Sequence, residues 1–444
     1  MKRLFVILIV FLLCLIAQPV LAENSPVNEK SMATLSPEEN LAVLKKKTEE
    51  NPKDFDAHFA YAKAAEELSL FKEAEETYLH MIYLDPTLDR VKLDLALLYT
   101  RTGKPGKAKK LYEEVLANNP PEGVKENINM VMKMVDDALK THKFGGSVAF
   151  GYNQDSNANS SSSSGSITFF DFSIPLEADS RAKKDGQVYG SFSLNHTYRF
   201  DLPEDGNKAA RWLSSASVYR TEQAELDDLD LQVLALRTGP ELDLIEQRTK
   251  LGLAANYNYI KLDSFEYLNI ASGEVYGQKG MGNSFSVNWN FSYENRHFVN
   301  SPLVQTYSDR TGYAFQYKVG AAYAITPKDI INGSITKRRE QAKKKYLSYN
   351  QMAITGSYIH SFDEGYFLNL NAGYRPSDYD DVDPFVSLTK TREDRERTGG
   401  INIGKQFKNG ITLMVGYEYK NSRSNIENFD FNNHRFSSGV SYSF

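Results

Sequence analysis

Four oxygen-bearing side chains at alternating positions form the best candidate for a binding site in this sequence. Asn153, Asp155, Asn157 and Asn159 share one face if a strand runs through them. They could contact a cation or a passing client molecule at the mouth of a channel, although calcium loops require several acidic oxygens and a closing glutamate. Because only Asp155 is acidic, a hydrogen-bonded ladder that fixes the following loop is the favoured interpretation. We therefore treat Asn153, Asp155 and Asn157 as candidate contacts at the mouth of a lumen.

Known catalytic motifs are absent from the sequence. The seven histidines are scattered, and there is no zinc-protease, nucleophile-elbow or phosphate-loop motif. His196 and His360 lie on predicted strands, where a structural role is favoured. A Ser/His/Asp hydrolase stays open as an alternative, because triads are recognised by geometry and not by sequence order. We expect no enzymatic activity, no cofactor and no metal site.

Two charged segments stand out against a formal net charge of -5. Segment 221–230 is acidic. The basic segment 337–345 could contact anionic lipid phosphates at the rim of a membrane protein, or it could be a solvated hairpin. The mild overall acidity gives no support for nucleic-acid binding. The cations of the basic segment are Lys337, Arg338, Arg339, Lys343, Lys344 and Lys345.

The end of the chain, residues 434–444, predicts a β-strand with one apolar face. Phe436, Val440, Tyr442 and Phe444 fall on one side of this strand, and small polar residues fall on the other. A last strand with an aromatic C-terminus is typical of outer-membrane β-barrels. We interpret Val440, Tyr442 and Phe444 as a signal for barrel insertion. The strand should also pair with the first strand, because an unpaired edge is not tolerated in lipid.

The start of the chain has the features of a signal peptide, residues 1–22. A basic start precedes an apolar run that ends at Ala17, and cleavage is expected after Ala22. This cleavage removes Cys14, the one cysteine of the chain, which suits export to an oxidising compartment. Residues 23–35 are predicted to be a linker. The mean hydropathy of -0.48 is ordinary for a barrel with a polar lumen.

Residues 36–140 are predicted to form an α-helical domain with a 34-residue repeat. Small residues at helix crossings and a proline at the end of each repeat are the tetratricopeptide pattern. Unrelated amphipathic helices are the weaker alternative. Arrays of this kind form a solenoid and present concave surfaces to peptides or proteins. The repeat framework comprises Ala62, Ala74, Tyr78, Pro86, Ala96, Ala108, Tyr112 and Pro120.

Residues 144–444 have a hydrophobic period of two and predict a transmembrane antiparallel β-barrel of about 14 strands. The strands of a soluble β-sandwich also alternate apolar and polar residues. The apolar face here is rich in aromatic residues, however, which matches the aromatic girdles of membrane barrels. With fourteen strands, most connections alternate between short turns and longer loops, as expected for such barrels. The very short link at 262–264 keeps 12 or 16 strands open. Val319 should face lipid, whereas Lys318 and Gly320 should face the lumen.

The combination of an exported leader, helical repeats and such a barrel resembles the surface lipoprotein assembly modifiers, the Slam family. The resemblance is most specific at the domain junction, residues 145–157, and in the closing segment 417–426. The stretch 392–395 is also similar. Ala158 and Asn159 stand where the family usually has Val-Asn. The resemblance implies periplasmic repeats that dock a client and an outer-membrane barrel through which, or beside which, the client reaches the cell surface.

The function implied by this resemblance is delivery of a lipoprotein or a related secreted protein to the cell surface, with no covalent step. The expected partners are this client, outer-membrane lipid, the barrel-assembly machinery and periplasmic chaperones, and no nucleic acid. An exopolysaccharide export porin is the alternative, because some export porins also join periplasmic repeats to a barrel. The expected lumen residues are mixed in charge and do not decide between the two: Arg199, Gln316, Lys318, Glu418 and Lys420.

Overall fold

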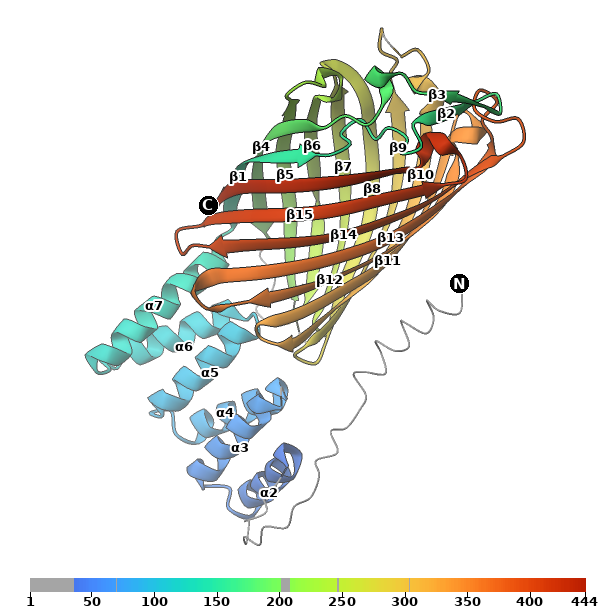
Figure 1. Ribbon diagram of the computed structural model, residues 1–444. Helices are drawn as coiled ribbons and strands as arrows, with labels where there is room; N and C mark the ends of the chain where they lie inside the picture. The colour runs from blue at the N-terminus through green and yellow to red at the C-terminus, as the bar shows by residue number, and fades with distance from the viewer. Residues whose placement is uncertain (1–35, 69, 201–207, 246, 303) are drawn as a thin grey trace, which may run out of the picture.

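The computed structural model describes residues 36–444 except 69, 201–207, 246 and 303. The described chain forms a group of helices followed by a closed β-barrel, and the helices lie at one end of the barrel (Figure 1). The predicted signal peptide and linker, residues 1–35, lie outside the described residues. No helix in the described part of the chain is long and apolar enough to cross a membrane.

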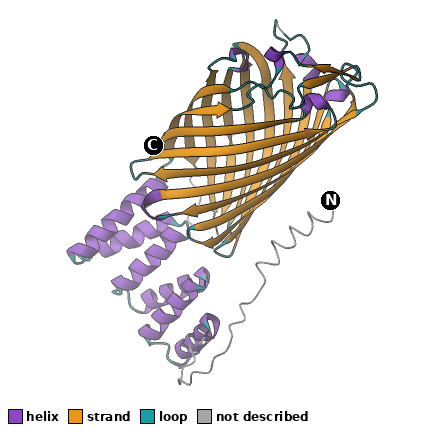
Figure 2. Cartoon of the chain, viewed as in Figure 1, coloured by secondary structure: helices purple, strands orange, loops and turns teal. Residues whose placement is uncertain are grey.

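Six α-helices precede the barrel in the described residues, and each packs against the next (Figure 2). The first begins with a capping box: the Ser36 hydroxyl accepts from the Glu39 amide, and the Glu39 carboxylate accepts from the Ser36 amide. Asp54 caps the second helix through the amide of Ala57. The helices are α2 (Pro37–Glu50), α3 (Phe55–Glu67), α4 (Phe71–Leu84), α5 (Asp89–Arg101), α6 (Pro105–Ala117) and α7 (Glu122–Leu139).

Small side chains allow these helices to approach one another closely. Ala62, Ala74, Ala96 and Ala108 are completely buried in the core that the helices share. A larger side chain at any of these positions would push two helices apart, because protein cores are close-packed. Helices are therefore present where the repeat predicts them, and the interpretation of their spacing as a tetratricopeptide array stays a prediction.

Fourteen antiparallel strands close into one barrel, and the last strand pairs with the first. The prediction of about 14 strands is confirmed. The barrel strands are β1 (His142–Asp155), β4 (Asp185–Arg199), β5 (Lys208–Gln223), β6 (Leu231–Leu244), β7 (Thr249–Leu262), β8 (Phe265–Met281), β9 (Phe285–Phe298), β10 (Gly312–Thr326), β11 (Asp329–Ala342), β12 (Tyr349–Ser361), β13 (Tyr366–Val382), β14 (Thr391–Gln406), β15 (Ile411–Ser424) and β16 (Phe431–Ser443).

Two features of the sheets differ from the sequence prediction. A small hairpin of β2 (Ser166–Phe169) and β3 (Phe172–Pro175) lies in the loop between β1 and β4. Several strands are also longer than their hydrophobic period indicates; β13, expected over 366–375, continues to Val382. The added residues include three aspartates, and Asp378 contacts Arg395 of the neighbouring strand at 2.7 Å.

The two faces of the barrel wall differ in polarity. On β10, Val319 is 56% exposed on the outer face, whereas Gly320 is buried on the inner face. Val319 stands between Trp289 and Ile335 of the neighbouring strands, which are also apolar. Serine, asparagine, glycine and paired ions alternate with this apolar set on the inner face. An apolar outer wall around a polar lumen is the architecture of outer-membrane β-barrels.

The connections at the two ends of the barrel differ in length. We refer to the end beside the helices as the helical end and to the other as the loop end. Short turns such as 282–284 and 327–328 lie at the helical end, and long segments such as 156–184 lie at the loop end. The short link between β7 and β8 is also at the loop end; Asp263 and Ser264 both have positive φ, which a tight two-residue hairpin requires.

Candidate functional site

Paired ions line the lumen where β9, β10 and β11 meet. The Arg338 guanidinium contacts Glu294 at 2.7 Å and Glu340 at 3.1 Å, and Arg296 also contacts Glu340. These four side chains are mostly buried, and a buried charge without a partner costs on the order of several kcal/mol. The pairs therefore stabilise the wall. Sequence analysis did not identify these four residues as a group. The available signal was a pair of charges two residues apart on β9 and another such pair on β11.

A second polar group forms a hollow of about 400 Å³ on the inner wall between β5 and β10. Arg237 contacts Glu274 at 2.8 Å, and the Asn290 amide donates to the same carboxylate at 2.8 Å. Amides and hydroxyls both donate and accept hydrogen bonds, so this wall could bind hydroxylated or peptide-like groups. Further lining residues are Ser215, Ser217, Asn256, Asn258, Ser272 and Ser292.

Opposite charges also stay paired elsewhere on the inner wall. Lys420 contacts Glu396 at 2.9 Å, and Arg375 contacts the same carboxylate. Near the helical end, Arg211 contacts Asp243 at 2.7 Å. These contacts mix charge signs along the lumen, so the described wall gives no reason for selecting a passing molecule by the sign of its charge.

The candidate residue Asp155 lies at the loop end of β1, where the barrel closes. Its carboxylate is 3% exposed and contacts Arg435 of β16 at 2.9 Å. It also accepts a hydrogen bond of 2.5 Å from the Asn433 amide. The acidic group of the predicted cluster is therefore used to join the first strand to the last.

Asn153 and Asn157 make the neighbouring contacts and are also buried. The Asn153 amide donates to Gln187 of β4 at 3.0 Å. Asn157 donates to the Ser161 carbonyl and accepts from the Ser161 amide, both at 2.9 Å. Together with Asp155, these side chains tie β4, β16 and the following loop to β1, which is the arrangement of a hydrogen-bonded ladder.

The loop that follows carries the β2–β3 hairpin over to other loops at the loop end (Figure 1). The Phe170 amide donates to the Phe385 carbonyl at 3.2 Å. The Asp171 carboxylate accepts from the Ser387 hydroxyl and, at 2.9 Å, from the Leu388 amide. The hydrogen bond from Ser387, and then that from Leu388, lower the pKa of Asp171 below its usual range. This contact therefore persists at neutral pH.

The C-terminal residues close the barrel at the helical end. Phe444 and Gly146 exchange two backbone hydrogen bonds of 3.0 and 2.9 Å. Val440, Tyr442 and Phe444 are exposed on the outer face of the barrel. A Cβ on Gly146 would lie 2.6 Å from the Phe444 ring, so a glycine is needed for the terminal ring to lie against β1.

The predicted framework residues lie within and at the ends of the helices. Tyr78 and Tyr112 are buried, and the Tyr78 hydroxyl donates to Glu66 at 2.7 Å. Burial, and then this hydrogen bond, raise the pKa of Tyr78 far above its usual value, so the phenol stays a neutral donor. Pro86 and Pro120 follow α4 and α6, where a proline cannot continue a helix.

The helical domain, residues 36–140, contacts the barrel at its rim. Lys143 at the start of β1 contacts Asp137 of α7 at 2.5 Å, and this contact lowers the pKa of Asp137. Arg248, in the turn between β6 and β7, lies over the Phe71 ring of α4 at 5.4 Å. The two contacts involve different helices, α7 and α4, and different barrel segments, the start of β1 and the turn between β6 and β7. Two separate contacts therefore hold the helical domain in one orientation relative to the barrel, which the chain connection between α7 and β1 would not do by itself.

Apolar side chains remain exposed on the helical domain. Met130 and Met134 lie one turn apart on α7 and are 66% and 67% exposed. Leu97 of α5 is also exposed. Methionine side chains are flexible and adapt to apolar partners of different shape. The domain thus exposes apolar side chains on α5 and α7, which the sequence alone did not identify.

The two histidines considered above lie toward the helical end. His196 stacks on Phe144 at 4.6 Å, and its ring contacts that of His142 at 3.0 Å. His360 contacts Asp329 at 2.6 Å. Among residues 36–444, leaving out the undescribed positions, no group of three or more metal-binding side chains is assembled.

The basic segment 337–345 is divided between the faces of β11 and the next loop. Arg338 points into the lumen and belongs to the ion cluster there. Arg339 contacts Asp380 at 2.5 Å, and Lys345 contacts Asp381 at 3.6 Å. Part of the segment is therefore neutralised locally, and contact of its other lysines with anionic lipid stays a hypothesis.

No family model and no curated protein matches the chain. Solved structures with some likeness include OpdQ of Pseudomonas aeruginosa, at 9% identity and a TM-score of 0.34 over 69% of this chain and 99% of that one. A bacterial polysaccharide outer-membrane secretin has 8% identity and a TM-score of 0.37 over 67% and 98%. A loop-deletion mutant of OmpT from Vibrio cholerae has 10% identity and a TM-score of 0.38 over 68% and 99%. The fold described above does not depend on these similarities.

Proposed function

We propose that the protein is an outer-membrane translocator that delivers a lipoprotein or a related secreted protein to the cell surface. The observation that carries this proposal is a helical domain with exposed apolar side chains, held by ionic and cation–π contacts at the rim of a membrane-type barrel. In this assignment the helical end faces the periplasm and the loop end faces the cell exterior. The long connections at the loop end support this orientation.

The helical domain acts in this proposal as a docking platform. Its repeats form a short tetratricopeptide array, and its exposed Met130, Met134 and Leu97 contact apolar segments of the client. Attachment at the barrel rim raises the effective concentration of a weakly bound client at the membrane. Guidance and release of the client need no covalent step, so the protein is not an enzyme in this mechanism.

Deletion of residues 36–140 tests the role of the domain. With the signal peptide retained, the barrel is expected to assemble, because its strands form their own closed sheet. Surface exposure of the lipoprotein encoded by a neighbouring gene is expected to fall, as measured by protease treatment of intact cells. Unchanged exposure in cells that contain the folded barrel would overturn the proposal.

A point variant gives a sharper version of this test. Met130→Ser with Met134→Ser removes apolar docking surface without touching the buried core, and lipoprotein display should fall. The matched control is Lys46→Ala with Glu50→Ala, an exposed ion pair on α2. Equal display in the two variants would argue against docking on α7.

The second candidate function is export of an exopolysaccharide. The hollow of serines and asparagines on the inner wall favours it, because such groups suit hydroxylated sugars. Loss of secreted polysaccharide in the deletion strain, with lipoprotein display unchanged, would select this function. A neighbouring glycosyltransferase cluster would support it, whereas a neighbouring lipoprotein gene favours the translocator.

A further inference from the structure

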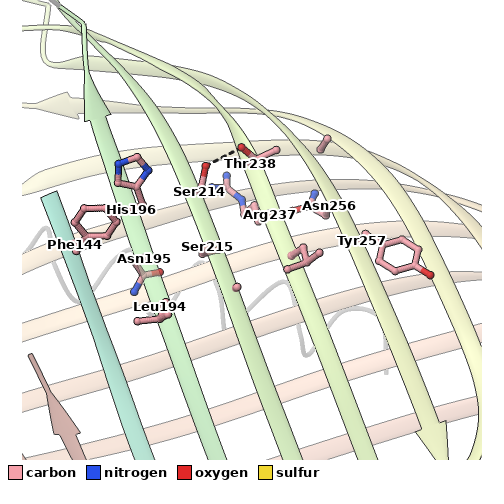
Figure 3. Close-up of a pocket in the computed structure, with 13 residues that line it drawn as sticks. Phe144, Leu194, Asn195, His196, Ser214, Ser215, Arg237, Thr238, Asn256 and Tyr257 are labelled. Carbon is pink, nitrogen blue, oxygen red and sulfur yellow. Dashed lines mark hydrogen bonds between the residues drawn. The ribbon is translucent and has the colours of Figure 1, made fainter. Parts of the chain in front are cut away.

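A trough crosses the outer wall of the barrel near its helical end (Figure 3). The strand register places a row of small residues side by side across four strands. Ser214 of β5 stands beside Thr238 of β6, which stands beside Ala255 of β7, followed by Gly273 of β8. A Cβ on Gly273 would meet no atom within 4 Å. Ser214, Thr238 and Ala255 form the floor of the trough, and Gly273 continues the row of small residues beyond it.

Larger side chains stand at the two ends of this row and along parts of both sides. His196 and Tyr293 end the row, one beside Ser214 and the other beside Gly273. One residue pair nearer the loop end, the bank consists of Leu194, Leu236 and Tyr257, with the small Ala216 between the two leucines. The opposite bank, toward the helical end, includes Tyr198 and Trp212. The hollow measures about 600 Å³.

The polar groups in the floor bond to one another. The Ser214 and Thr238 hydroxyls lie 2.9 Å apart, as the dashed line in Figure 3 shows. The indole nitrogen of Trp212 donates to the Thr238 hydroxyl at 2.7 Å. With these hydrogen bonds made, the floor requires no polar ligand. The trough therefore suits a purely apolar occupant.

The surroundings indicate what that occupant is. The outer wall of a barrel in a membrane faces hydrocarbon, and tryptophan and tyrosine rings sit at the level of the lipid headgroups. The row His142, Tyr198 and Trp212 lies one residue pair nearer the helical end than the floor. The acyl chain of a lipid whose headgroup lies at these three residues would therefore reach the trough directly. Because barrel strands are tilted, the floor of the trough runs obliquely from the headgroup level into the bilayer.

We propose that the trough binds one acyl chain of a phospholipid from the periplasmic leaflet, with the headgroup beside His142, Tyr198 and Trp212. This inference rests on the membrane orientation given under Proposed function. A chain in the trough makes more van der Waals contacts with protein atoms than a chain against a flush wall, and such packing contacts favour association within the hydrocarbon of a membrane. The wall around Val319 is flush by comparison, because its row contains Trp289, Ile335 and Ile354.

The two tryptophans of the chain provide an internal comparison. Trp212 lies on the bank of the trough, and Trp289 lies on the flush wall. Single-tryptophan proteins, Trp289→Phe and Trp212→Phe, are reconstituted in phosphatidylethanolamine vesicles with increasing fractions of acyl-brominated phosphatidylethanolamine, whose bromine quenches indole fluorescence. The quenching curve of Trp212 is expected to give a relative lipid affinity about threefold or more above that of Trp289, because a chain in the trough contacts more protein atoms. Superimposable curves would overturn the proposal.

Filling the trough supplies the control. In the Trp289→Phe protein, Ala216→Leu and, independently, Ala255→Leu should lower the affinity reported by Trp212 to that of the flush wall, because both residues line the hollow. Ala321→Leu, on the outer face of β10, should not change it. Heat-modifiable migration verifies folding of each variant. An affinity unchanged by filling in folded protein would contradict the proposal.

A last arm distinguishes phospholipid from a lipid anchor of the client. A diacylated lipopeptide is added to vesicles in which brominated phospholipid already quenches Trp212. The control is addition of the same amount of unbrominated phospholipid. If the lipopeptide restores Trp212 fluorescence no more than this control does, the result supports the phospholipid assignment. Much stronger recovery would overturn it and assign the trough to the client. The first two arms contain no client, so their failure is separate from failure of the proposed translocation.

Discussion

At the residue scale, the lumen wall depends on ion pairs that cannot be broken singly. Arg338→Ala would leave Glu294 and Glu340 largely buried with one cation fewer. Removal of one partner from such a group costs about 3–5 kcal/mol, so the variant should unfold at a clearly lower urea concentration in lipid vesicles. Arg220→Ala is the control, because its pair with Glu222 is exposed and is worth less than about 1 kcal/mol. Equal losses would contradict this account of the lumen.

The polarity of the wall predicts a second difference between single residues. Val319 faces lipid, and Val319→Arg should lower the free energy of unfolding by about 2–4 kcal/mol if it lies near the membrane midplane. Ala322→Arg places the same charge on the inner face of the same strand and should cost much less. The comparison is made by urea titration in vesicles. Similar costs would mean that the strand register is shifted by one residue, since that exchanges the faces.

The residue scale also shows how far sequence reasoning reaches. The alternation of Val319 with Lys318 and Gly320 was enough to predict which side chains face outward. The contact of Arg338 with Glu294 could not be predicted, because it depends on the register of β9, β10 and β11. Strand period fixes the face of a residue, but only the assembled sheet fixes its partner.

At the element scale, β16 both completes the sheet and carries the terminal aromatic ring. Deletion of Phe444 removes two backbone hydrogen bonds to Gly146 and an exposed ring of the outer wall. The amount of heat-modifiable protein in the outer membrane should therefore fall. Phe436→Ala, which removes an exposed ring from the same strand but keeps its length, should have the smaller effect. Normal assembly without Phe444 would rule out its role as an insertion signal.

The elements that sequence analysis missed are those without an amphipathic period. The β2–β3 hairpin has four-residue strands and lies within a serine-rich loop. Its position depends on distant partners, such as Ser387 and Leu388 for Asp171. The barrel strands, in contrast, have thirteen or more residues and alternate in polarity over much of that length, and their number of about 14 followed from the sequence. Local pattern predicts elements that bury a regular face, and not elements held by single polar contacts.

At the scale of the whole molecule, sequence analysis separated the helical domain from the barrel but gave no contact between them beyond the connection itself. Phe71 and Arg248 are far apart in the chain and belong to segments with different periods. Their contact requires both parts to be folded first. A domain fixed at the rim differs from one on a free tether, because only the fixed domain holds its exposed side chains in a constant direction relative to the barrel.

This difference predicts the effect of releasing the domain. Lys143→Ala with Arg248→Ala removes the partners of Asp137 and Phe71 from the barrel side and leaves the helices unchanged. Distances between spin labels at Lys46→Cys and Lys328→Cys should then spread over a wider range, and lipoprotein display should fall. Lys72→Ala with Lys125→Ala removes exposed pairs within the helices and is the control. An unchanged distance distribution would show that these contacts do not hold the domain. Normal lipoprotein display together with a broadened distance distribution would show that a flexible tether is sufficient. In that case the effective concentration of the client would matter, and the orientation of the domain would not.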